Sequence, residues 1–298
     1  MDTPINVYLV FKMHLEELLN IAIKAAEAAS KQILGVYHSE NFETELKGDK
    51  SPLTIADKRA HVCIVRHLEK TGLPILSEEG KDIPYEVRKY WKRFWMVDPL
   101  DGTKEFIKRN DEFTVNIALI ENHQPILGVL AVPVTGVVYY AAQGLGAFKL
   151  KSSTSNSQLT TSNRQPATGN QQLVTGNRQP ATGNSLTTGN QQLVTGNPQP
   201  ATRIVASRSH MNDETKDYIA KLGNTEVVSA GSSLKFMLIA EGKADIYPRF
   251  GPTMEWDTAA AHGILLELGL HLVTTDTNTE LAYNKENLLN PFFIAGST

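Results

Sequence analysis

Apolar residues recur every three or four positions near the start of the chain. Over residues 15–34 they form one continuous face, and Gly35 follows directly. This spacing predicts an amphipathic helix that ends at the glycine. The same spacing over residues 57–70 predicts a second helix, which Gly72 and Pro74 terminate.

After residue 74 the pattern changes to short β-branched and aromatic runs separated by turn residues, which is typical of strands. These runs occupy residues 75–76, 94–97, 114–120, 126–132 and 137–142. Their succession predicts an antiparallel sheet. Beyond Arg203, strands at 204–206 and 226–229 alternate with a helix at 213–222 and further helices, which predicts a second α/β layer.

Residues 151–202 differ from both flanking parts. The segment RQPATGN at 164–170 recurs at 178–184, and QQLVTGN at 171–177 recurs at 191–197. Each unit has too few apolar residues to bury, and proline and glycine recur where a coiled coil would need apolar positions. We therefore predict a disordered or loosely ordered surface insertion, with a partner-binding arm as the functional alternative. The chain then divides into residues 1–150, the insertion 151–202, and residues 203–298.

Composition and charge narrow the range of partners. The 298 residues are 41% hydrophobic and 20% charged, which is enough apolar material for one large domain or two medium ones. The 29 basic and 32 acidic residues are spread along the chain and give a net charge of −3, so nothing indicates nucleic acid or an anionic membrane as a partner. A small-molecule ligand fits better.

Cysteine usage and the N-terminus bear on location. Cys63 is the one cysteine, which excludes a disulfide framework and fits a reducing cytoplasm. The apolar run at residues 7–11 is short and lacks a small-residue cleavage site, so we expect neither a signal peptide nor a transmembrane span. Peripheral attachment at the inner face of a membrane stays open.

Candidate chemistry begins where the predicted strand 94–97 ends. The motif WMVDPLDGT (95–103) places Asp98 and Asp101 three positions apart, and Pro99 and Gly102 predict a turn that brings both carboxylates to one point. Mg²⁺ prefers carboxylate oxygens, and such a turn can add a main-chain carbonyl, here that of Leu100. An ordinary Asp-Pro/Asp-Gly turn is the commoner explanation of this motif taken alone.

Two further acidic positions favour a metal site. Glu78 in SEEG (77–80) again follows a short apolar strand, although a solvated acidic turn would look the same. Asp257 in EWD (255–257) opens an alanine-rich stretch that closes at Gly269, which predicts a helix with Asp257 as its N-cap. A capping carboxylate can also hold a cation, so the two roles are compatible.

These three motifs, in this order, resemble those of the lithium-sensitive, Mg²⁺-dependent phosphatase superfamily that includes inositol monophosphatase. Within it, the chain is similar to the bacterial CysQ-type 3'(2'),5'-bisphosphate nucleotidases. The segments that carry this second resemblance are KEFIKR (104–109), EFTVNIA (112–118), SRSH (207–210), GSSLKF (231–236) and YPRFGPT (247–253). Inositol monophosphatases usually follow the Gly-Thr with Thr-Asn rather than Lys-Glu. The resemblance covers nearly the whole chain outside residues 151–202.

The resemblance implies a layered α/β/α/β/α fold of the inositol-monophosphatase type, with Mg²⁺ as the cofactor. The metal ligands that it implies are Glu78, Asp98, the carbonyl of Leu100, Asp101 and Asp257. Asp57 and Thr103 match the pair that activates the attacking water in the family. Without the resemblance, Asp57 looks only like an aspartate at the start of a helix.

By the same resemblance the substrate is adenosine 3',5'-bisphosphate, cleaved to AMP and phosphate, with its phosphosulfate relative as a second candidate. The implied substrate-binding residues are Gly102, Thr103, His210, Ser232, Lys235 and Arg249. Taken alone, the basic ones among them would pass for solvated charges. One rival interpretation is an inositol monophosphatase or broad sugar phosphatase with the same metal residues. The other is a non-catalytic phospholigand-binding scaffold whose repeat arm recruits a partner.

Overall fold

The structure is a computed structural model that describes residues 7–39, 44–46, 52–80, 82–151, 171–172, 201–206 and 211–297. The α-helices are α1 (Val7–Tyr37), α2 (Ile55–Leu68), α3 (Tyr85–Arg88), α4 (Thr103–Lys108), α5 (Asp213–Lys221), α6 (Leu234–Ala240) and α7 (Glu255–Leu266). Short 3₁₀ turns occupy Glu69–Thr71 and Glu78–Gly80. A two-stranded ribbon of β1 (Thr44–Leu46) and β2 (Pro52–Thr54) precedes α2.

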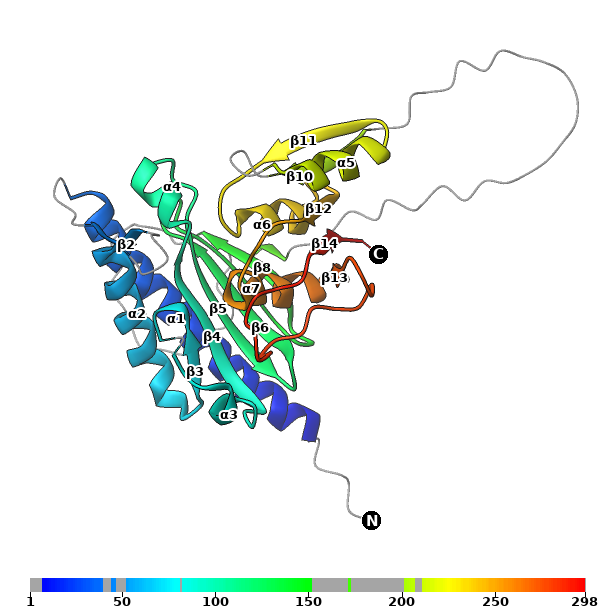
Figure 1. Cartoon of the computed structure of the whole chain (residues 1–298). Helices are drawn as coiled ribbons and strands as arrows, with labels where there is room; N and C mark the ends of the chain where they lie inside the picture. Colours follow the sequence, from blue (N-terminus) through cyan, green and yellow to red (C-terminus); the bar gives the residue numbers. More distant parts are fainter. Residues whose placement is uncertain are drawn as a thin grey trace, which may run out of the picture.

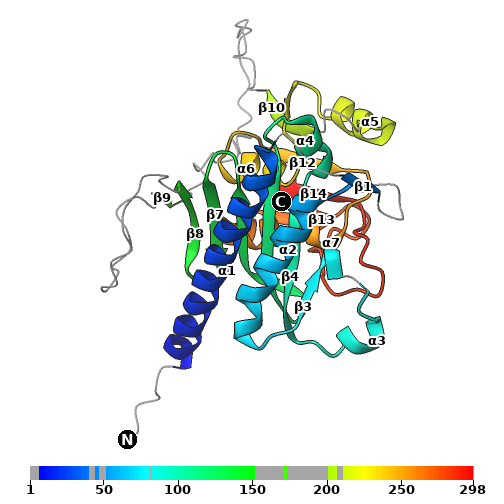
Figure 2. The ribbon, with the colours of Figure 1, turned by 90° about the vertical axis from the view of Figure 1, so that its left-hand side faces the viewer.

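Helices α1 and α2 pack side by side and cover one face of the larger sheet (Figure 2). The apolar face predicted for residues 15–34 is buried against that sheet, with small residues such as Ala22, Ala25 and Ala29 at the contact. Helix α1 runs two residues beyond Gly35, so the predicted stop at that glycine is wrong. Burial of the last turn, including Tyr37, outweighs the low helix propensity of glycine.

The larger sheet has seven strands in the described part of the chain, in the order β3-β4-β5-β6-β7-β8-β9. They are β3 (Ile75–Ser77), β4 (Arg93–Asp101), β5 (Thr114–Glu121), β6 (Gln124–Val132), β7 (Val137–Ala142), β8 (Gly146–Lys151) and β9 (Gln171–Gln172). All neighbours pair antiparallel except β3 and β4, which confirms the predicted antiparallel sheet. Strand β9 belongs to the repeat segment; residues 152–170 and 173–200, on which the prediction of disorder falls, lie outside the described residues.

Strand β4 shows how the sheet separates two hydrophobic cores. Its side chains alternate, so that Trp95 and Val97 join the core under α1 and α2, whereas Phe94 and Met96 join a second core on the opposite face. Helices α6 and α7 fill this second core. Because both faces are covered, β4 lacks the polar alternation of a half-exposed strand.

Helix α7 lies unusually close to the larger sheet, over Gly128 of β6. A Cβ atom on Gly128 would lie 2.0 Å from the carbonyl oxygen of Ala260 in α7. Gly263, one turn further along, faces the same part of β6. Only glycine fits at position 128 with the helix at this distance, so the contact fixes the position of α7 on the sheet.

Beyond α6 and α7 lies a second sheet with the order β11-β10-β12-β14-β13. Its strands are β10 (Thr202–Ala206), β11 (Thr225–Ser229), β12 (Ile246–Arg249), β13 (His271–Thr274) and β14 (Phe293–Gly296). Helix α5 lies on its outer face (Figure 1). The predicted second α/β layer is confirmed, although the last three strands gave no clear sequence signal.

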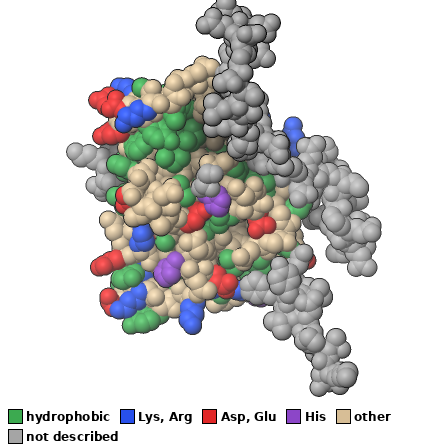
Figure 3. Space-filling model, turned by 90° about the vertical axis from the view of Figure 1, so that its right-hand side faces the viewer, with side chains coloured by type: hydrophobic (Ala, Val, Ile, Leu, Met, Phe, Trp, Pro, Cys, Tyr) green, Lys and Arg blue, Asp and Glu red, His purple; other side chains and the backbone are tan. Residues whose placement is uncertain are grey.

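The layers therefore follow the order α1 and α2, larger sheet, α6 and α7, smaller sheet, α5, which confirms the expected α/β/α/β/α arrangement (Figure 1). Among the described residues, no helix combines the length and the apolar character that crossing a membrane requires. On the face of the molecule in Figure 3, acidic and basic side chains are scattered and do not gather into a patch of one sign.

Candidate active site

The last residues of β4 hold two of the predicted site aspartates. The pairing of β4 with β5 loses its register between Asp98 and Asp101, at the point where Pro99 interrupts the strand. The main-chain N–H of Leu100 donates to Oδ1 of Asp98 at 3.1 Å. The predicted turn is thus an irregularity inside β4, which continues to Asp101, and it holds both aspartates at one edge of the sheet.

Gly102 directly follows Asp101 and turns the chain into helix α4. Its φ of 92° lies in the left-handed region, and a Cβ atom there would lie 3.2 Å from Cβ of Ser232. Glycine is therefore the residue that this turn accepts most readily. Thr103 is the first residue of α4, so a short helix opens directly after the Asp-Gly turn.

Asp57, Glu78 and Asp257 come to the same place from other parts of the fold. Asp57 lies buried in the first turn of α2, Glu78 begins the 3₁₀ turn after β3, and Asp257 lies in the first turn of α7. Burial raises the pKa of Asp98 well above its usual value, and four carboxylates add to this rise, in the order Glu78, Asp101, Asp257 and Asp57. The structure thus brings the predicted acidic residues into one cluster, which we call the acidic cluster.

Asp257 occupies a different helix position from the one predicted. Helix α7 begins at Glu255 with Met254 as its N-cap, so Asp257 is the third helical residue. Its Oδ2 accepts the main-chain N–H of Met254 at 2.8 Å, which is one half of a capping box. The N-cap assignment is therefore wrong, although the carboxylate does satisfy a free N–H group at the helix start.

The surroundings of Asp257 oppose its charge. Burial raises the pKa of Asp257 to about 8, with further rises from Asp101 and Glu78, while the Met254 N–H and Arg249 act in the opposite direction. Part of its surface reaches a hollow, but protein atoms enclose the carboxyl group closely enough for desolvation to dominate.

Hydroxyl groups from three residues contact Asp101. Ser232 and Ser233 donate to its Oδ2 at 2.6 Å each, and Thr114 of β5 lies 3.5 Å from the same oxygen. Thr114 and Ser232 also bond to each other at 2.7 Å. Ser233 and Thr114 were not predicted as site residues, because nothing in the local sequence shows that the start of α6 lies over the end of β4.

A hollow of about 180 Å³ opens above the acidic cluster. Its lining includes the acidic residues Asp101 and Asp257 and the basic residues Lys104, Lys235 and Arg249. Burial lowers the pKa of Lys235, and Arg249 adds to this, whereas Asp101, Glu105 and Asp257 act to raise it. Such a mixture of carboxylates and cations suits a phosphate group with a metal ion beside it.

A second hollow of about 570 Å³ adjoins the first and shares Lys104 and Arg249 with it. Its remaining wall is more apolar and includes Met211, Phe250 and Pro252. Phe250 packs against Tyr218 and Phe292, with ring centroids 5.5 and 6.0 Å apart. The predicted residue His210 lies outside the described residues.

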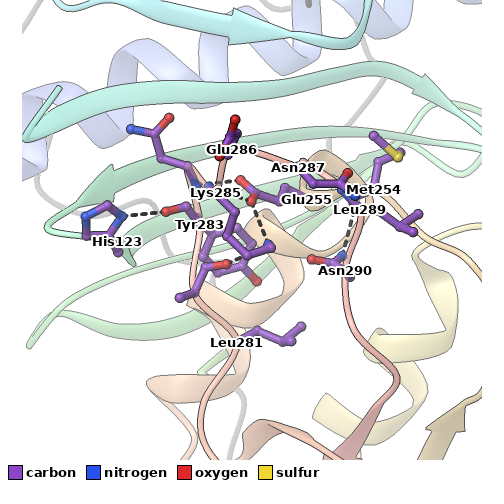
Figure 4. Close-up of polar contacts among 12 residues, drawn as sticks. His123, Met254, Glu255, Leu281, Tyr283, Lys285, Glu286, Asn287, Leu289 and Asn290 are labelled. Atoms are coloured by element: carbon purple, nitrogen blue, oxygen red, sulfur yellow. Dashed lines mark hydrogen bonds and ion pairs between the residues drawn. The ribbon is translucent and has the colours of Figure 1, made fainter. Parts of the chain in front are cut away.

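A neighbouring acidic residue shows a different environment. Glu255 begins α7 and is fully buried, yet it accepts main-chain N–H groups of Asn284 at 2.5 Å and Lys285 at 3.0 Å. The ammonium group of Lys285 reaches the same carboxylate at 2.6 Å (Figure 4). Arg88 donates to the Asn284 side chain at 3.0 Å and to main-chain carbonyls of the same loop, so Glu255 is part of a network that fixes that loop.

The donor set of the acidic cluster fits a hard divalent cation. Burial and the neighbouring carboxylates raise the pKa values of Asp98 and Asp257. A bound positive ion would stabilise the ionised forms of these two acids, and carboxylate oxygens are the groups that Mg²⁺ prefers. In the described part of the chain, no group of three or more His, Cys, Asp or Glu side chains has the arrangement needed to hold a metal ion. The fit to a cation therefore rests on the type and charge of these side chains and not on a coordination geometry.

Comparison with known proteins identifies the family. The sequence model of the inositol monophosphatase family matches residues 14–292, and the chain belongs to this family. Membership makes it an enzyme of the phosphatase class, a phosphoric monoester hydrolase. The resemblance noted in the sequence is thereby confirmed.

Relatives of the CysQ type match along nearly their whole length. The 3'(2'),5'-bisphosphate nucleotidase CysQ of Salmonella typhimurium is 41% identical over 282 residues, which cover 94% of this chain and 98% of that protein. CysQ of Buchnera aphidicola is 35% identical over 287 residues, with 94% of each chain covered.

Solved structures agree with this assignment. CysQ from Bacteroides thetaiotaomicron, a bacterial member of the inositol monophosphatase family, superposes with a TM-score of 0.77 at 43% identity, covering 95% of this chain and 97% of that one. The extragenic suppressor protein suhB from Bartonella henselae gives a TM-score of 0.65 at 20% identity, with 94% of each chain covered, and shows the shared fold alone.

Proposed function

We propose that this protein is a Mg²⁺-dependent phosphatase that removes the 3'-phosphate of adenosine 3',5'-bisphosphate and releases AMP and phosphate. The observation that carries the proposal is the acidic cluster, which lies beneath a hollow lined by Lys104, Lys235 and Arg249. Relatives with more than 40% identity over nearly the whole chain bear the name 3'(2'),5'-bisphosphate nucleotidase, which supports the choice of substrate.

In this proposal Glu78, Asp98, the carbonyl of Leu100, Asp101 and Asp257 hold the metal. Bound Mg²⁺ supplies positive charge to the phosphate and makes a nearby water more acidic. Asp57 accepts a proton from the attacking water, and the Thr103 hydroxyl orients that water. The turn at Gly102 and Thr103 presents main-chain N–H groups to the phosphate oxygens. Positioning and charge neutralisation are thus the main contributions of the protein.

The rest of the nucleotide requires groups outside the acidic cluster. Lys235 and Arg249 bind the second phosphate, Ser232 and His210 are the further substrate-binding residues, and the second hollow offers room for a nucleoside. Lys104 and Arg249 line both hollows, so a ligand that spans them passes between two cations. A small monophosphate has no group to place there.

The proposal is tested by phosphate release from adenosine 3',5'-bisphosphate, measured beside its phosphosulfate relative and inositol 1-phosphate, with Mg²⁺ varied and with Li⁺ added. We expect the bisphosphate to have the higher kcat/KM, activity to require Mg²⁺, and Li⁺ to inhibit. Preference for inositol 1-phosphate would replace the proposed substrate. Full turnover without a divalent cation would contradict the metal assignment.

A further inference from the structure

Ser233 occupies the N-cap position of helix α6, but its side chain does not cap the helix. Serine at this position commonly accepts an N–H group from the first helical turn. Here no such side-chain hydrogen bond is formed, and the hydroxyl group points instead toward the acidic cluster. Ser233 is almost completely buried, so its hydroxyl group has to find its partners within the protein.

Three groups lie within hydrogen-bond distance of the Ser233 hydroxyl. The Asn116 amide donates to it at 2.9 Å, and its own hydrogen has two acceptors, Oδ2 of Asp101 at 2.6 Å and the main-chain carbonyl of Asp257 at 2.8 Å. One hydroxyl hydrogen serves one strong bond at a time, and an ionised carboxylate is the stronger acceptor. The amide of Asn116 therefore orients Ser233 as a donor to Asp101.

These contacts connect two of the proposed metal ligands that lie far apart in the sequence. Asp101 ends β4 and Asp257 lies in α7, while Asn116 belongs to β5. Because Ser232 also donates to Oδ2 of Asp101, both short hydroxyl bonds fall on one oxygen of that carboxylate. The orientation of the carboxylate is fixed in this way, with its other oxygen left as the better site for a cation.

We propose that Ser233 is a positioning residue for the metal site: held by Asn116, it sets the orientation of the Asp101 carboxylate and its spacing from Asp257. The inference rests on the proposed function, because it assumes that these two aspartates hold Mg²⁺. Partners in the second layer around a metal typically change metal affinity by about 10–100-fold when they are removed. Ser233 is one of the residues that line the hollow, but the role proposed here is exerted through Asp101 and not through a bond to the metal.

The test compares the Mg²⁺ requirement of the full-length wild type with that of Ser233→Ala, Ser233→Thr and the control Ser30→Ala. Ser30 donates to the carbonyl of Ala26 inside α1, away from the acidic cluster. The requirement is measured twice, as the Mg²⁺ concentration for half-maximal phosphate release and as that for half of the Mg²⁺-induced rise in Tm. The second measurement needs no substrate.

We expect Ser233→Ala to need about tenfold more Mg²⁺ in both assays, with kcat at saturating Mg²⁺ changed far less. Ser233→Thr keeps the hydroxyl and should return the requirement toward that of the wild type, and Ser30→Ala should match the wild type. A lower Tm for Ser233→Ala with an unchanged Mg²⁺ requirement would mean a purely structural role and overturn the inference.

A second variant keeps the test decisive if Ser233→Ala does not fold. Asn116→Ala removes the donor that orients Ser233, so its Mg²⁺ requirement should also rise, and an unchanged requirement would contradict the positioning role. If the wild type itself responds to Mg²⁺ in neither assay, the proposed function fails. If the wild type responds and the variants respond equally, only the inference about Ser233 fails.

Discussion

Glu255 and Asp257 lie two positions apart in the first turn of α7, and their environments differ in kind. Glu255 is fully buried, and it is bonded by two main-chain N–H groups and the Lys285 ammonium group. Burial raises its pKa, while Lys285 and Asn284 counteract that rise. Burial raises the pKa of Asp257 to about 8, and the charges of Asp101 and Glu78 add to this rise.

The difference separates a structural carboxylate, Glu255, from Asp257, which we propose to hold the metal. A buried acid whose charge is met by donors within the protein stabilises the fold around it and needs no ligand. An acid held among other acids is destabilised by repulsion between their negative charges, and a bound cation can reduce that repulsion. For Glu255 and Asp257, the charge of the neighbouring groups therefore distinguishes the two roles better than the exposure of the side chains does.

The largest expected effect is on catalysis, from a change within the acidic cluster. Asp101→Asn should lower activity at least about a hundredfold, because it removes a charged group proposed to hold Mg²⁺. The metal-free protein should unfold at an equal or higher temperature, since one repulsive charge is gone. Phosphate release and thermal unfolding with a chelator check this, with Asp217→Asn on the exposed side of α5 as the control. Turnover at the wild-type rate in Asp101→Asn would contradict the proposed metal site. Asp98→Asn should lower activity to a similar extent.

The compensated carboxylate should give the opposite result. Glu255→Ala should destabilise the protein by about 3–5 kcal/mol, because it leaves two N–H groups and an ammonium group without their acceptor. The Mg²⁺ requirement of the remaining folded protein should stay close to that of the wild type. Urea unfolding measures the first effect and phosphate release the second. Glu286→Ala is a fitting control, since Glu286 is exposed and its contact with Arg88 uses the main chain.

The next effect concerns substrate choice around the acidic cluster. Arg249→Ala should lower kcat/KM for the adenosine bisphosphate by about ten- to over a hundredfold, because a charge-assisted contact to phosphate contributes about 1.5–3 kcal/mol. Hydrolysis of a small monophosphate should change much less. Equal losses on both substrates would make Arg249 a structural residue. Lys221→Ala is the matched control, because it removes one positive charge at an exposed position at the end of α5.

A smaller effect should appear in the pH dependence of stability. The raised pKa of Asp257 means that the metal-free folded state binds a proton more tightly than the unfolded chain does. This contribution to stability is complete below the unfolded pKa near 4 and is lost as the pH rises through about 8. The Tm of the metal-free protein should therefore fall across this range. Saturating Mg²⁺ should flatten the profile, and an identical slope with and without Mg²⁺ would contradict the acidic cluster as its source.

The buried histidine His262 should act in the opposite direction at lower pH. Burial lowers its pKa, although Glu280, 2.9 Å from its Nε2, counteracts this. A lowered pKa means that stability is complete above the unfolded pKa near 6.5 and is lost as the pH falls. His262 is not a proposed metal ligand, so Mg²⁺ should leave this loss of stability at low pH unchanged. The response to Mg²⁺ therefore separates the effect of His262 from that of Asp257.

The smallest effect is expected from the repeat segment. Replacing residues 153–200 by a short Gly-Ser join should keep activity and change stability by less than about 1 kcal/mol, because the entropy of closing a loop depends only weakly on its length. The deletion does remove the edge strand β9, whose two residues pair with β8. Kinetics and thermal unfolding of the shortened protein check the prediction, and a loss of folding would make the repeats structural.

Local sequence predicted the elements that have strong periodicity. The helices over residues 15–34 and 57–70 and the strands β4 to β7 were found, because each has either a complete apolar face or a continuous apolar run. Strands β12, β13 and β14 were missed, since each has four residues and β12 contains Pro248. Such short strands are defined by their neighbours in the sheet more than by their own residues.

The site shows the same limit. The acidic residues were found through their motifs, and the structure places them together around Asp98. The contacts of Ser233 with Asp101 and with the carbonyl of Asp257 depend on how α6 packs between two sheets, and a single Ser-Ser pair carries no sign of this. The position of Asp257 within its helix was wrong by three residues for a related reason, because Met254 is an N-cap without a capping side chain of the usual kind.

The contact between Gly128 and Ala260 fixes the middle of α7 against the larger sheet, about one turn from Asp257. A side chain added at position 128 would push Ala260 and the helix turn around it away from β6, because its Cβ atom would lie 2.0 Å from the carbonyl oxygen of Ala260. A helix moves as a unit, so the displacement would reach Asp257 about one turn away. A substitution in the middle of strand β6 is therefore expected to change the geometry of the proposed metal site.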